Sequence, residues 1–152
     1  MDNRVPPPLV GLLTAALMAL LAAHAGLPGL PDVRFRPVLV GLLTVTGLAF
    51  DLAGLLAFRS RKTTVNPLHP ERASALVTHG VYRFTRNPMY IGMVCLLLAW
   101  GVYLSDAAAL LLGPLAYVLY LNRFQIGPEE QVLLGLFGDA YRDYMARVRR
   151  WL

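Results

Sequence analysis

Residues 88–124 read PMYIGMVCLLLAWGVYLSDAAALLLGPLAYVLYLNRF and are almost entirely apolar. Two apolar runs, 88–105 and 107 to about 124, meet at Ser105-Asp106, and Pro114 interrupts the second run. At roughly 1.5 Å per residue, each run approaches the thickness of the hydrocarbon layer of a bilayer. Because so few residues join them, the runs predict an antiparallel hairpin of membrane helices. Residues before 88 and residues after 124 are then expected at the same end of the hairpin.

Two further apolar runs precede this hairpin. Residues 9–27 carry no formal charge, and residues 37–58 carry one, Asp51. With 57% hydrophobic and 15% charged residues, the 152-residue chain is far more apolar than an ordinary soluble domain. The first run follows three prolines and exceeds the usual apolar length of a secretory signal, so we interpret it as a retained helix. The sequence therefore predicts an all-α integral membrane protein with about four transmembrane helices, in one domain of residues 1–152.

The basic residues are distributed unevenly between the two ends of the predicted bundle. Of the 14 Lys and Arg residues, all but Arg34 and Arg36 lie before the first run, between the second and third, or after the fourth. The positive-inside rule then places both termini and residues 59–87 in the cytoplasm. Attraction to anionic lipid headgroups accounts for the net charge of +5, so the charge does not indicate a nucleic-acid partner.

The C-terminal tail has its own pattern. Apolar residues recur at close to helical spacing from Glu129 to Val148, which predicts an amphipathic helix. Pro128 suits its first turn, and the acids that follow suit the positive end of the helix dipole. We assign Tyr144 to the aromatic belt at the membrane interface. A short helix is also expected around residues 71–76.

Several residues inside the apolar runs could be structural or functional. An unpaired Asp51 would cost at least ~2.5 kcal/mol, so it is expected to face the bundle, be paired or be protonated, and either a functional role or a structural pairing fits. The single cysteine, Cys95, is expected to be a small core residue and forms no intramolecular disulfide. Gly92, Gly101 and Gly113 permit close helix approach and would support a homodimer.

The hairpin brings two polar segments together. Arg86 and Asn87 precede the third run, while Arg123 and the Glu129-Glu130 pair follow the fourth. Since both segments lie at the same end of the hairpin, they are expected to form one site. No Gly-x-Gly-x-x-Gly motif follows a strand pattern, so the soluble dinucleotide-type cofactor fold is excluded.

Four motifs in this part of the chain occur in a familiar order: LVTHGVY at 76–82, RNPMYIG at 86–92, the Glu129-Glu130 pair, and FGDAY at 137–141. The chain resembles the isoprenylcysteine carboxyl methyltransferase family and its phospholipid methyltransferase relatives. The resemblance runs from about residue 66 to the C-terminus. It implies two N-terminal spans in residues 1–58 and a cofactor-binding core in residues 59–152.

The resemblance also implies an S-adenosylmethionine-dependent methyltransferase with a lipid-like substrate. The contacts to S-adenosylmethionine would fall on Leu76, Val77, Tyr82, Arg86, Asn87, Pro88, Tyr90, Glu129 and Glu130. Eukaryotic members of the family carry an arginine shortly before the acidic pair. The nearby candidates here are Arg123 and Gln125, and an ungapped alignment favours Gln125 at that position. We expect Arg123 and Glu130 to be catalytic. Asn87 replaces the histidine that is common at its position, and an amide cannot titrate near neutrality.

These residue types match the chemistry of S-adenosylmethionine. Glu129 or Glu130 could bind its amino group, and Arg86 or Arg123 could hold its carboxylate. Tyr82 and Tyr90 could line the adenine or the sulfonium, because aromatic ring faces attract cations. No cluster of ligands at metal spacing is present in the sequence.

The nature of the acceptor stays open. A prenylated thiol-derived acid, a phospholipid amine and a quinone-like phenol all fit a membrane methyltransferase. A nicotinamide-dependent lipid or sterol reductase and a non-catalytic membrane scaffold are the alternatives.

Overall fold

The computed structural model describes residues 5–24, 34–60 and 75–152, and in these residues the chain is helical apart from short connections. Its elements are α1 (Pro7–His24), α2 (Arg36–Ser60), the short 3-10 helix η2 (Gly80–Arg83), α3 (Pro88–Leu104), α4 (Ala107–Tyr120), the π-helix η3 (Leu121–Ile126) and α5 (Gly127–Arg147). Three helical segments are long and apolar enough to cross a membrane: α1, α2 and the continuous stretch from α4 to α5. The shorter α3 has 17 residues. The chain is an all-α membrane protein, as predicted.

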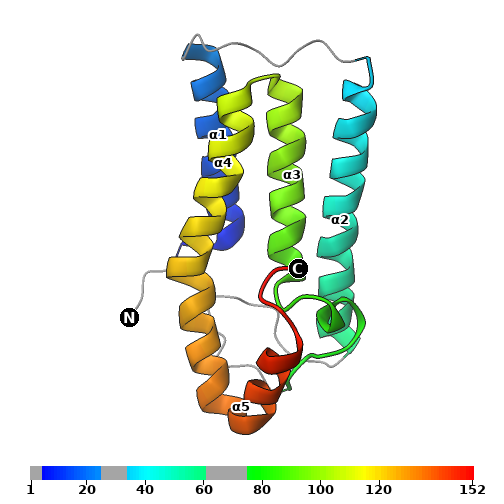
Figure 1. Cartoon of the computed structure of the whole chain (residues 1–152), viewed down its shortest axis with the longest axis vertical. Helices are drawn as coiled ribbons and strands as arrows, with labels where there is room; N and C mark the ends of the chain where they lie inside the picture. The colour runs from blue at the N-terminus through cyan, green and yellow to red at the C-terminus, as the bar shows by residue number, and fades with distance from the viewer. Residues whose placement is uncertain (1–4, 25–33, 61–74) are drawn as a thin grey trace.

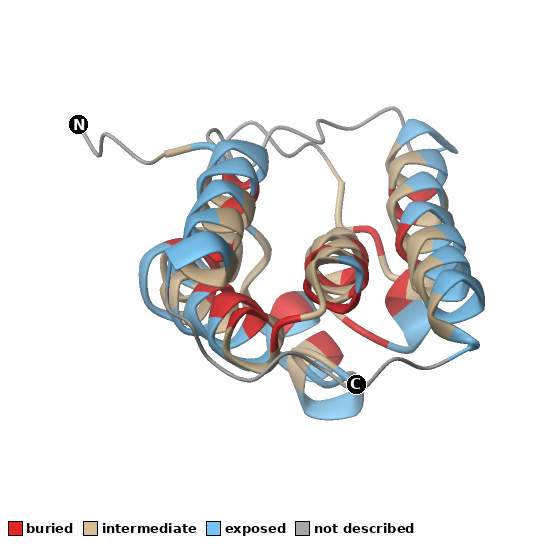
Figure 2. Ribbon diagram, turned by 90° about the horizontal axis from the view of Figure 1, so that it is seen from above, coloured by how far each residue is buried: buried red, intermediate tan, exposed pale blue. Residues whose placement is uncertain are grey.

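Helix α3 lies at the centre of the bundle, with α2 on one side and the α1–α4 pair on the other (Figure 1). Seen from above, buried residues face α3 and exposed residues point outward (Figure 2). The outward side chains are large and apolar, as lipid contact requires, for example Leu17, Leu42 and Leu111. The core cluster consists of Met18, Leu97, Ala109, Tyr117, Leu121 and Ile126.

Helices α3 and α4 form the predicted tight hairpin. Ser105 has a left-handed φ of 59°, and the Asp106 carboxylate accepts a hydrogen bond of 2.7 Å from the backbone N–H of Ala109. Such a side-chain cap satisfies one of the free donors at a helix N-terminus. Pro114 lies inside α4 without interrupting it, unlike our expectation.

The three glycines expected to support a homodimer pack within the chain. A side chain at Gly92 would collide with Asp51 and with the carbonyl oxygen of Gly47, both in α2. Gly101 lies against Leu110 of α4, and Gly113 lies against Met18 of α1. These glycines therefore serve helix packing inside one molecule.

The C-terminal segment differs from the expected separate helix. Helix α4 continues through η3 into α5, and the Gly127 N–H donates to the Asn122 carbonyl in the wider π register. A change of register and a proline such as Pro128 are both common where a helix bends, so the chain passes Pro128 without ending the helix. Helix α5 breaks instead at Gly138, where φ is 51° and ψ is −124°.

After this break the chain turns back toward the start of α3 (Figure 1). The backbone N–H of Arg86 donates to the carbonyl of Arg149 at 3.0 Å, which ties the tail to the segment before α3. The helix expected around residues 71–76 falls mainly outside the described residues, and Leu76 is not helical.

Candidate functional site

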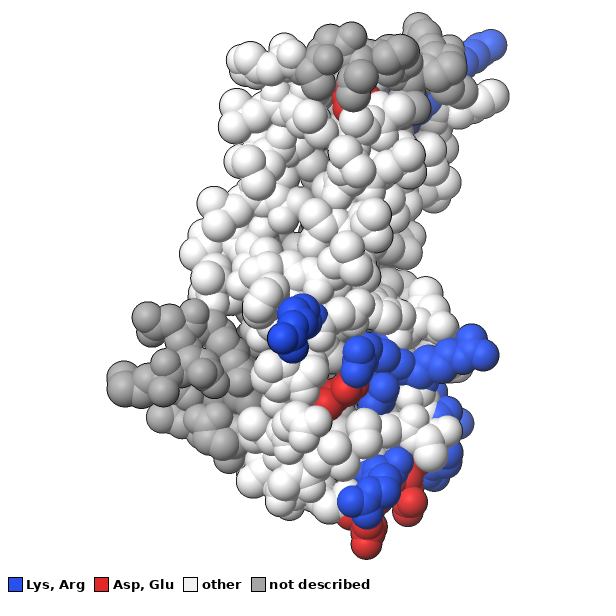
Figure 3. Space-filling view, turned by 60° about the vertical axis from the view of Figure 1, so that its left-hand side comes forward, with Lys and Arg blue, Asp and Glu red and all other residues white. Residues whose placement is uncertain are grey.

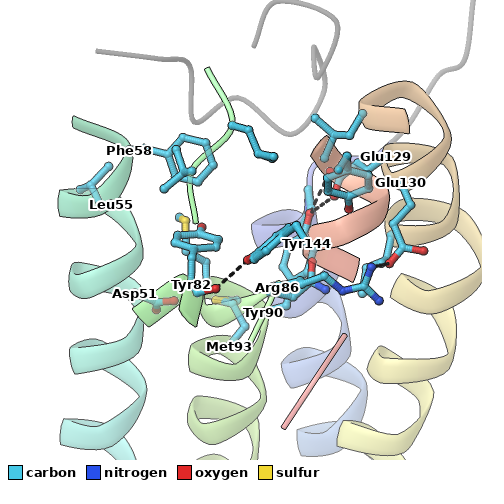
Figure 4. Close-up of a pocket in the computed structure, with 18 of the residues that line it drawn as sticks. Asp51, Leu55, Phe58, Tyr82, Arg86, Tyr90, Met93, Glu129, Glu130 and Tyr144 are labelled. Atoms are coloured by element: carbon cyan, nitrogen blue, oxygen red, sulfur yellow. Dashed lines mark hydrogen bonds and ion pairs between the residues drawn. The ribbon is translucent and has the colours of Figure 1, made fainter. Parts of the chain in front are cut away.

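A cavity of about 680 Å³ lies at the end of the bundle where α2 finishes and α3 starts. One wall is apolar and comes from α2, through Leu48, Leu52, Leu55 and Phe58. The opposite wall is polar and comes from the segment before α3 and from α5, as Figure 4 shows. The cavity thus joins a lipid-like surface to a charged one, within the volume range of small-molecule sites.

Glu130 is the anionic centre of an ion-pair cluster. Its Oε1 lies 3.2 Å from Nη1 of Arg86, and the two side chains are only 12% and 11% exposed. The Arg150 guanidinium binds the same carboxylate through Nε at 3.1 Å and Nη2 at 2.5 Å. Paired bonds of this kind fix the orientation of a carboxylate. Glu130 therefore holds Arg86 and the C-terminal tail in place.

Glu129, the next residue, has different partners. The Tyr90 hydroxyl from α3 donates to its two carboxylate oxygens at 3.0 and 3.3 Å. Nε2 of Gln125, a residue that is 1% exposed, donates to Oε1 at 2.5 Å. The Glu129 carboxylate is thus oriented by neutral donors at the edge of the cavity.

Arg86 carries donors that the described residues leave unsatisfied. Its Nε and Nη1 are buried and have no hydrogen-bond partner in the described part of the chain, although Nη1 lies within ion-pair distance of Glu130. Buried donors without partners are rare in folded proteins and often mark a ligand site. Arg86 lines the cavity, so these donors are available to an anionic group bound there.

The aromatic residues Tyr82 and Tyr144 form part of the cavity wall. The Tyr144 hydroxyl donates to the backbone carbonyl of Tyr82 at 2.7 Å, and the Tyr82 ring packs edge-on against Phe58 at 5.3 Å. Burial, followed by the effects of Tyr144 and Glu129, raises the pKa of Tyr82 above its usual value, so its hydroxyl stays neutral. Our assignment of Tyr144 to the membrane interface was wrong, because this residue is 4% exposed and sits inside the protein.

The C-terminal tail is hydrogen-bonded to the segment before α3 and to η3. Nδ2 of Asn87 donates to the carbonyl of Arg150 at 2.9 Å, and the Thr85 hydroxyl donates to the same carbonyl at 3.3 Å. Nε1 of Trp151 donates to Oδ1 of Asn122 in η3 at 3.1 Å. Asn87 therefore fastens the tail with its amide, a task that needs no titratable group.

Most of the residues predicted for the site lie together. The cavity lining includes Leu76, Val77, Tyr82, Arg86, Asn87, Tyr90, Glu129 and Glu130. Pro88 is buried at the start of α3 and packs near Gly54 of α2. Arg123 is not part of this group: it is exposed, and its guanidinium lies 6.0 Å from the Phe124 ring.

The site predicted from the sequence lacks several residues. Tyr141 and Tyr144 line the cavity, and Arg150 binds Glu130 from outside it. Asp51, whose role the sequence left open between function and structural pairing, lines the cavity too. For the two tyrosines, their spacing of three residues was the available signal. Nothing in the local sequence around Arg150 distinguishes it from its neighbours Arg147 and Arg149, because its position depends on the turn at Gly138.

Comparison with known families agrees with this architecture. The model of the phospholipid methyltransferase family matches residues 35–140, from the start of α2 to the middle of the α5 segment. This match covers more than half of the chain. The chain belongs to the phospholipid methyltransferase family.

Individual relatives span different parts of the chain. An uncharacterized protein of Haemophilus influenzae is 45% identical over 64 residues, which are 42% of this chain and 100% of that protein. The protein-S-isoprenylcysteine O-methyltransferase of Tribolium castaneum is 28% identical over 127 residues, 80% of this chain and 43% of the relative. The methanethiol S-methyltransferase of Mycobacterium tuberculosis is 32% identical over 105 residues, 65% of this chain and 37% of the relative. The chain therefore spans less than half the length of these two named methyltransferases.

Proposed function

We propose that the protein transfers a methyl group from S-adenosylmethionine to a lipophilic acceptor in the membrane. The observation that carries this proposal is the composition of the cavity: an oriented Glu129 and a buried Arg86 on one wall, and the apolar side chains of α2 on the other. The family membership supports the same reaction type, as do the two named relatives, an O-methyltransferase and an S-methyltransferase.

The residues present fit S-adenosylmethionine. Its amino-acid part is a zwitterion, and the cavity offers the Glu129 carboxylate together with the unsatisfied donors of Arg86. The rings of Tyr82, Tyr90 and Tyr144 offer faces for a flat adenine and for a cation. Arg123 is exposed, so we assign the carboxylate contact to Arg86.

Bound S-adenosylmethionine would supply an electrophilic methyl group, so this chain has mainly to position the reactants and exclude water. Tyr90 and Gln125 fix the Glu129 carboxylate, and Glu130 fixes Arg86. Glu130 is thus a positioning residue in this proposal. The tail residues Arg149 and Arg150 hold Arg86 and Asn87 in place through their carbonyl groups.

The acceptor would enter along α2, whose cavity wall is made of leucine and phenylalanine side chains. The cofactor would enter from the cytoplasm. Of the described basic residues, Arg34 and Arg36 lie at the end of the molecule away from the site. The others gather at the end that holds the site, where most of the blue surface in Figure 3 lies. By the positive-inside rule the site end is cytoplasmic.

The test is the affinity for S-adenosylhomocysteine, measured by calorimetry on detergent-purified protein. We expect micromolar binding to the wild type and at least about a tenfold loss in Glu129→Gln, because that change removes the anion and keeps the shape. Asp139→Asn is the matched control, since Asp139 is an exposed acid on the same helix. The proposal is refuted if S-adenosylhomocysteine does not bind to the wild type, or if it binds equally well to Glu129→Gln and Asp139→Asn.

A further inference from the structure

The apolar wall of the cavity contains one carboxylate. Asp51 lies nine residues before the end of α2 at Ser60, roughly 13 Å along the helix axis, among the leucines of the same wall. It lies across the cavity from Glu129 and Glu130, as Figure 4 shows. Asp51 lies at the level of Gly92, which is in the second turn of α3.

The fold makes room for Asp51 but gives it no partner. Its carboxylate lies against Gly92, where any side chain would collide with it. No hydrogen bond or ion pair joins Asp51 to another residue within ranges 5–24, 34–60 and 75–152. An acid at this depth in a membrane helix is costly, and such residues commonly mark a substrate path. The sequence left open that Asp51 is paired with another residue for structural reasons. Among the described residues Asp51 has no such partner.

We propose that Asp51 contacts the reactive head of the acceptor, and that this head carries its proton on the nucleophile, as N–H, O–H or S–H, rather than being a free carboxylate. The inference rests on the proposed methyl transfer and specifies its substrate class. Asp51 would accept a hydrogen bond from the head while the apolar tail packs on Leu48, Leu52 and Leu55.

Charge complementarity supports this choice of head. Arg86 is the one Lys or Arg side chain among the described residues that line the cavity, and it already faces Glu130. An acceptor carboxylate beside Asp51 would place two anions together in an apolar wall, with no second cation from the lining to offset their repulsion. A protonated amine would be attracted, and a neutral alcohol or thiol would donate a hydrogen bond.

In the proposed methyl transfer, Asp51 would also accept the proton that the acceptor loses. An acceptor bound as an ammonium would first pass one proton to the Asp51 carboxylate, and from there to water, which frees the lone pair of its nitrogen. The lone pair of the acceptor heteroatom would then form the new bond to the methyl carbon, and the carbon–sulfur bond of the methyl donor would break with its electron pair remaining on sulfur. A neutral alcohol or thiol would give its proton to the Asp51 carboxylate as the new bond forms, and the proton would pass from there to water. Asp51 is thus a catalytic residue on the acceptor side, distinct from the cofactor-binding wall.

The experiment uses three amphiphiles with the same tail: dodecylamine, dodecanethiol and dodecanoate. Wild type, Asp51→Asn and Asp51→Leu are reconstituted in lipid nanodiscs, and Thr44→Val serves as the matched control. Thr44 lies on the same helix but outside the cavity, and its hydroxyl donates a hydrogen bond to the Val40 carbonyl. Binding of each amphiphile without cofactor, methyl transfer to each, affinity for S-adenosylhomocysteine and thermal midpoint are measured.

We expect the wild type to bind and methylate the amine or the thiol in preference to dodecanoate. Asp51→Asn should lose about tenfold or more in both binding and kcat/KM for that head, while Thr44→Val behaves as wild type. Affinity for S-adenosylhomocysteine should be unchanged in both Asp51 variants. Their thermal midpoint should be unchanged or higher, because no bond in the described fold depends on the carboxylate.

Three results would overturn the role of Asp51. The wild type could prefer dodecanoate, it could bind none of the three amphiphiles, or Asp51→Asn could bind and methylate the preferred head as the wild type does. A lower thermal midpoint in Asp51→Leu with unchanged head selectivity would do the same and indicate a structural acid. The proposed methyl transfer is tested separately by the affinity for S-adenosylhomocysteine: it fails if the wild type does not bind, or if Glu129→Gln binds as tightly as the Asp139→Asn control.

Discussion

At the scale of single residues, the adjacent acids Glu129 and Glu130 have separate tasks. Glu130 is bound by two guanidinium groups, from Arg86 and Arg150, and is largely buried. Glu129 receives hydrogen bonds from Tyr90 and Gln125, so its charge is not neutralised by these partners. Consecutive residues of a helix point in different directions, so the two neighbouring acids have different partners. Glu130 binds the two guanidinium groups, and Glu129 is the candidate ligand contact.

The Tyr90 hydroxyl can be tested separately from its ring. Tyr90→Phe removes a hydrogen bond to a charged group, a change of about 1.5–3 kcal/mol, and leaves the aromatic face in place. We expect the affinity for S-adenosylhomocysteine to fall by about tenfold, because Glu129 loses the hydrogen bond from Tyr90 that orients it. Calorimetry of Tyr90→Phe beside Tyr103→Phe, an exposed hydroxyl on the same helix, makes the comparison. Equal affinities would show that the Tyr90 hydroxyl is not needed to position Glu129.

Which site residues the sequence could predict depended on how local their signals were. Arg86, Tyr90 and Glu129 stand in short motifs before and after the α3–α4 hairpin, so the hairpin alone brings them together at its open end. An ungapped alignment favoured Gln125 at the position of the family's arginine, but the catalytic prediction named Arg123, because the register of the π-helix η3 is not visible in the sequence. The structure buries Gln125 and exposes Arg123.

At the scale of elements, the break in α5 has the largest effect on the site. Apolar spacing predicted one helix from Glu129 to Val148, and periodicity continues across Gly138 in the sequence. The backbone at Gly138 nevertheless reverses the chain, which brings Tyr141 and Tyr144 to the cavity. Glycine within a helical pattern was the local signal for this break.

Replacing Gly138 tests this turn. Its φ of 51° with ψ of −124° is a conformation that side chains other than glycine adopt at a cost of about 1–3 kcal/mol. Gly138→Ala should therefore lower the thermal midpoint and weaken binding of S-adenosylhomocysteine, since Tyr144 and the tail would shift. Gly135→Ala is the matched control: it lies on the exposed side of the same helix with open space around it, so it should stabilise by about 0.5–1 kcal/mol. A stable, fully binding Gly138→Ala would mean that the turn does not require glycine.

At the scale of the whole molecule, hydrophobicity sets the number and order of the helices, and the contacts between them set the site. The predicted spans differ from α1 to α4 by a few residues at their ends, because long apolar runs leave few alternatives in a membrane. The arrangement of α3 between α2 and the α1–α4 pair was not predictable from periodicity. It follows from close contacts at Gly47, Gly92, Gly101 and Gly113, whose partners lie far away in sequence.

The orientation of the molecule in the membrane is the remaining global prediction, and it constrains the proposed reaction. S-adenosylmethionine is charged and is made in the cytoplasm, so a site at the outer end would have no access to it. In a Cys95→Ala background, Phe35→Cys and Asp139→Cys place single thiols at exposed positions on opposite ends of the bundle. A membrane-impermeant maleimide added to intact cells should label Phe35→Cys, and should label Asp139→Cys only after lysis. The reverse pattern would place Glu129 and Arg86 outside the cell, and a methyl donor confined to the cytoplasm could not reach them.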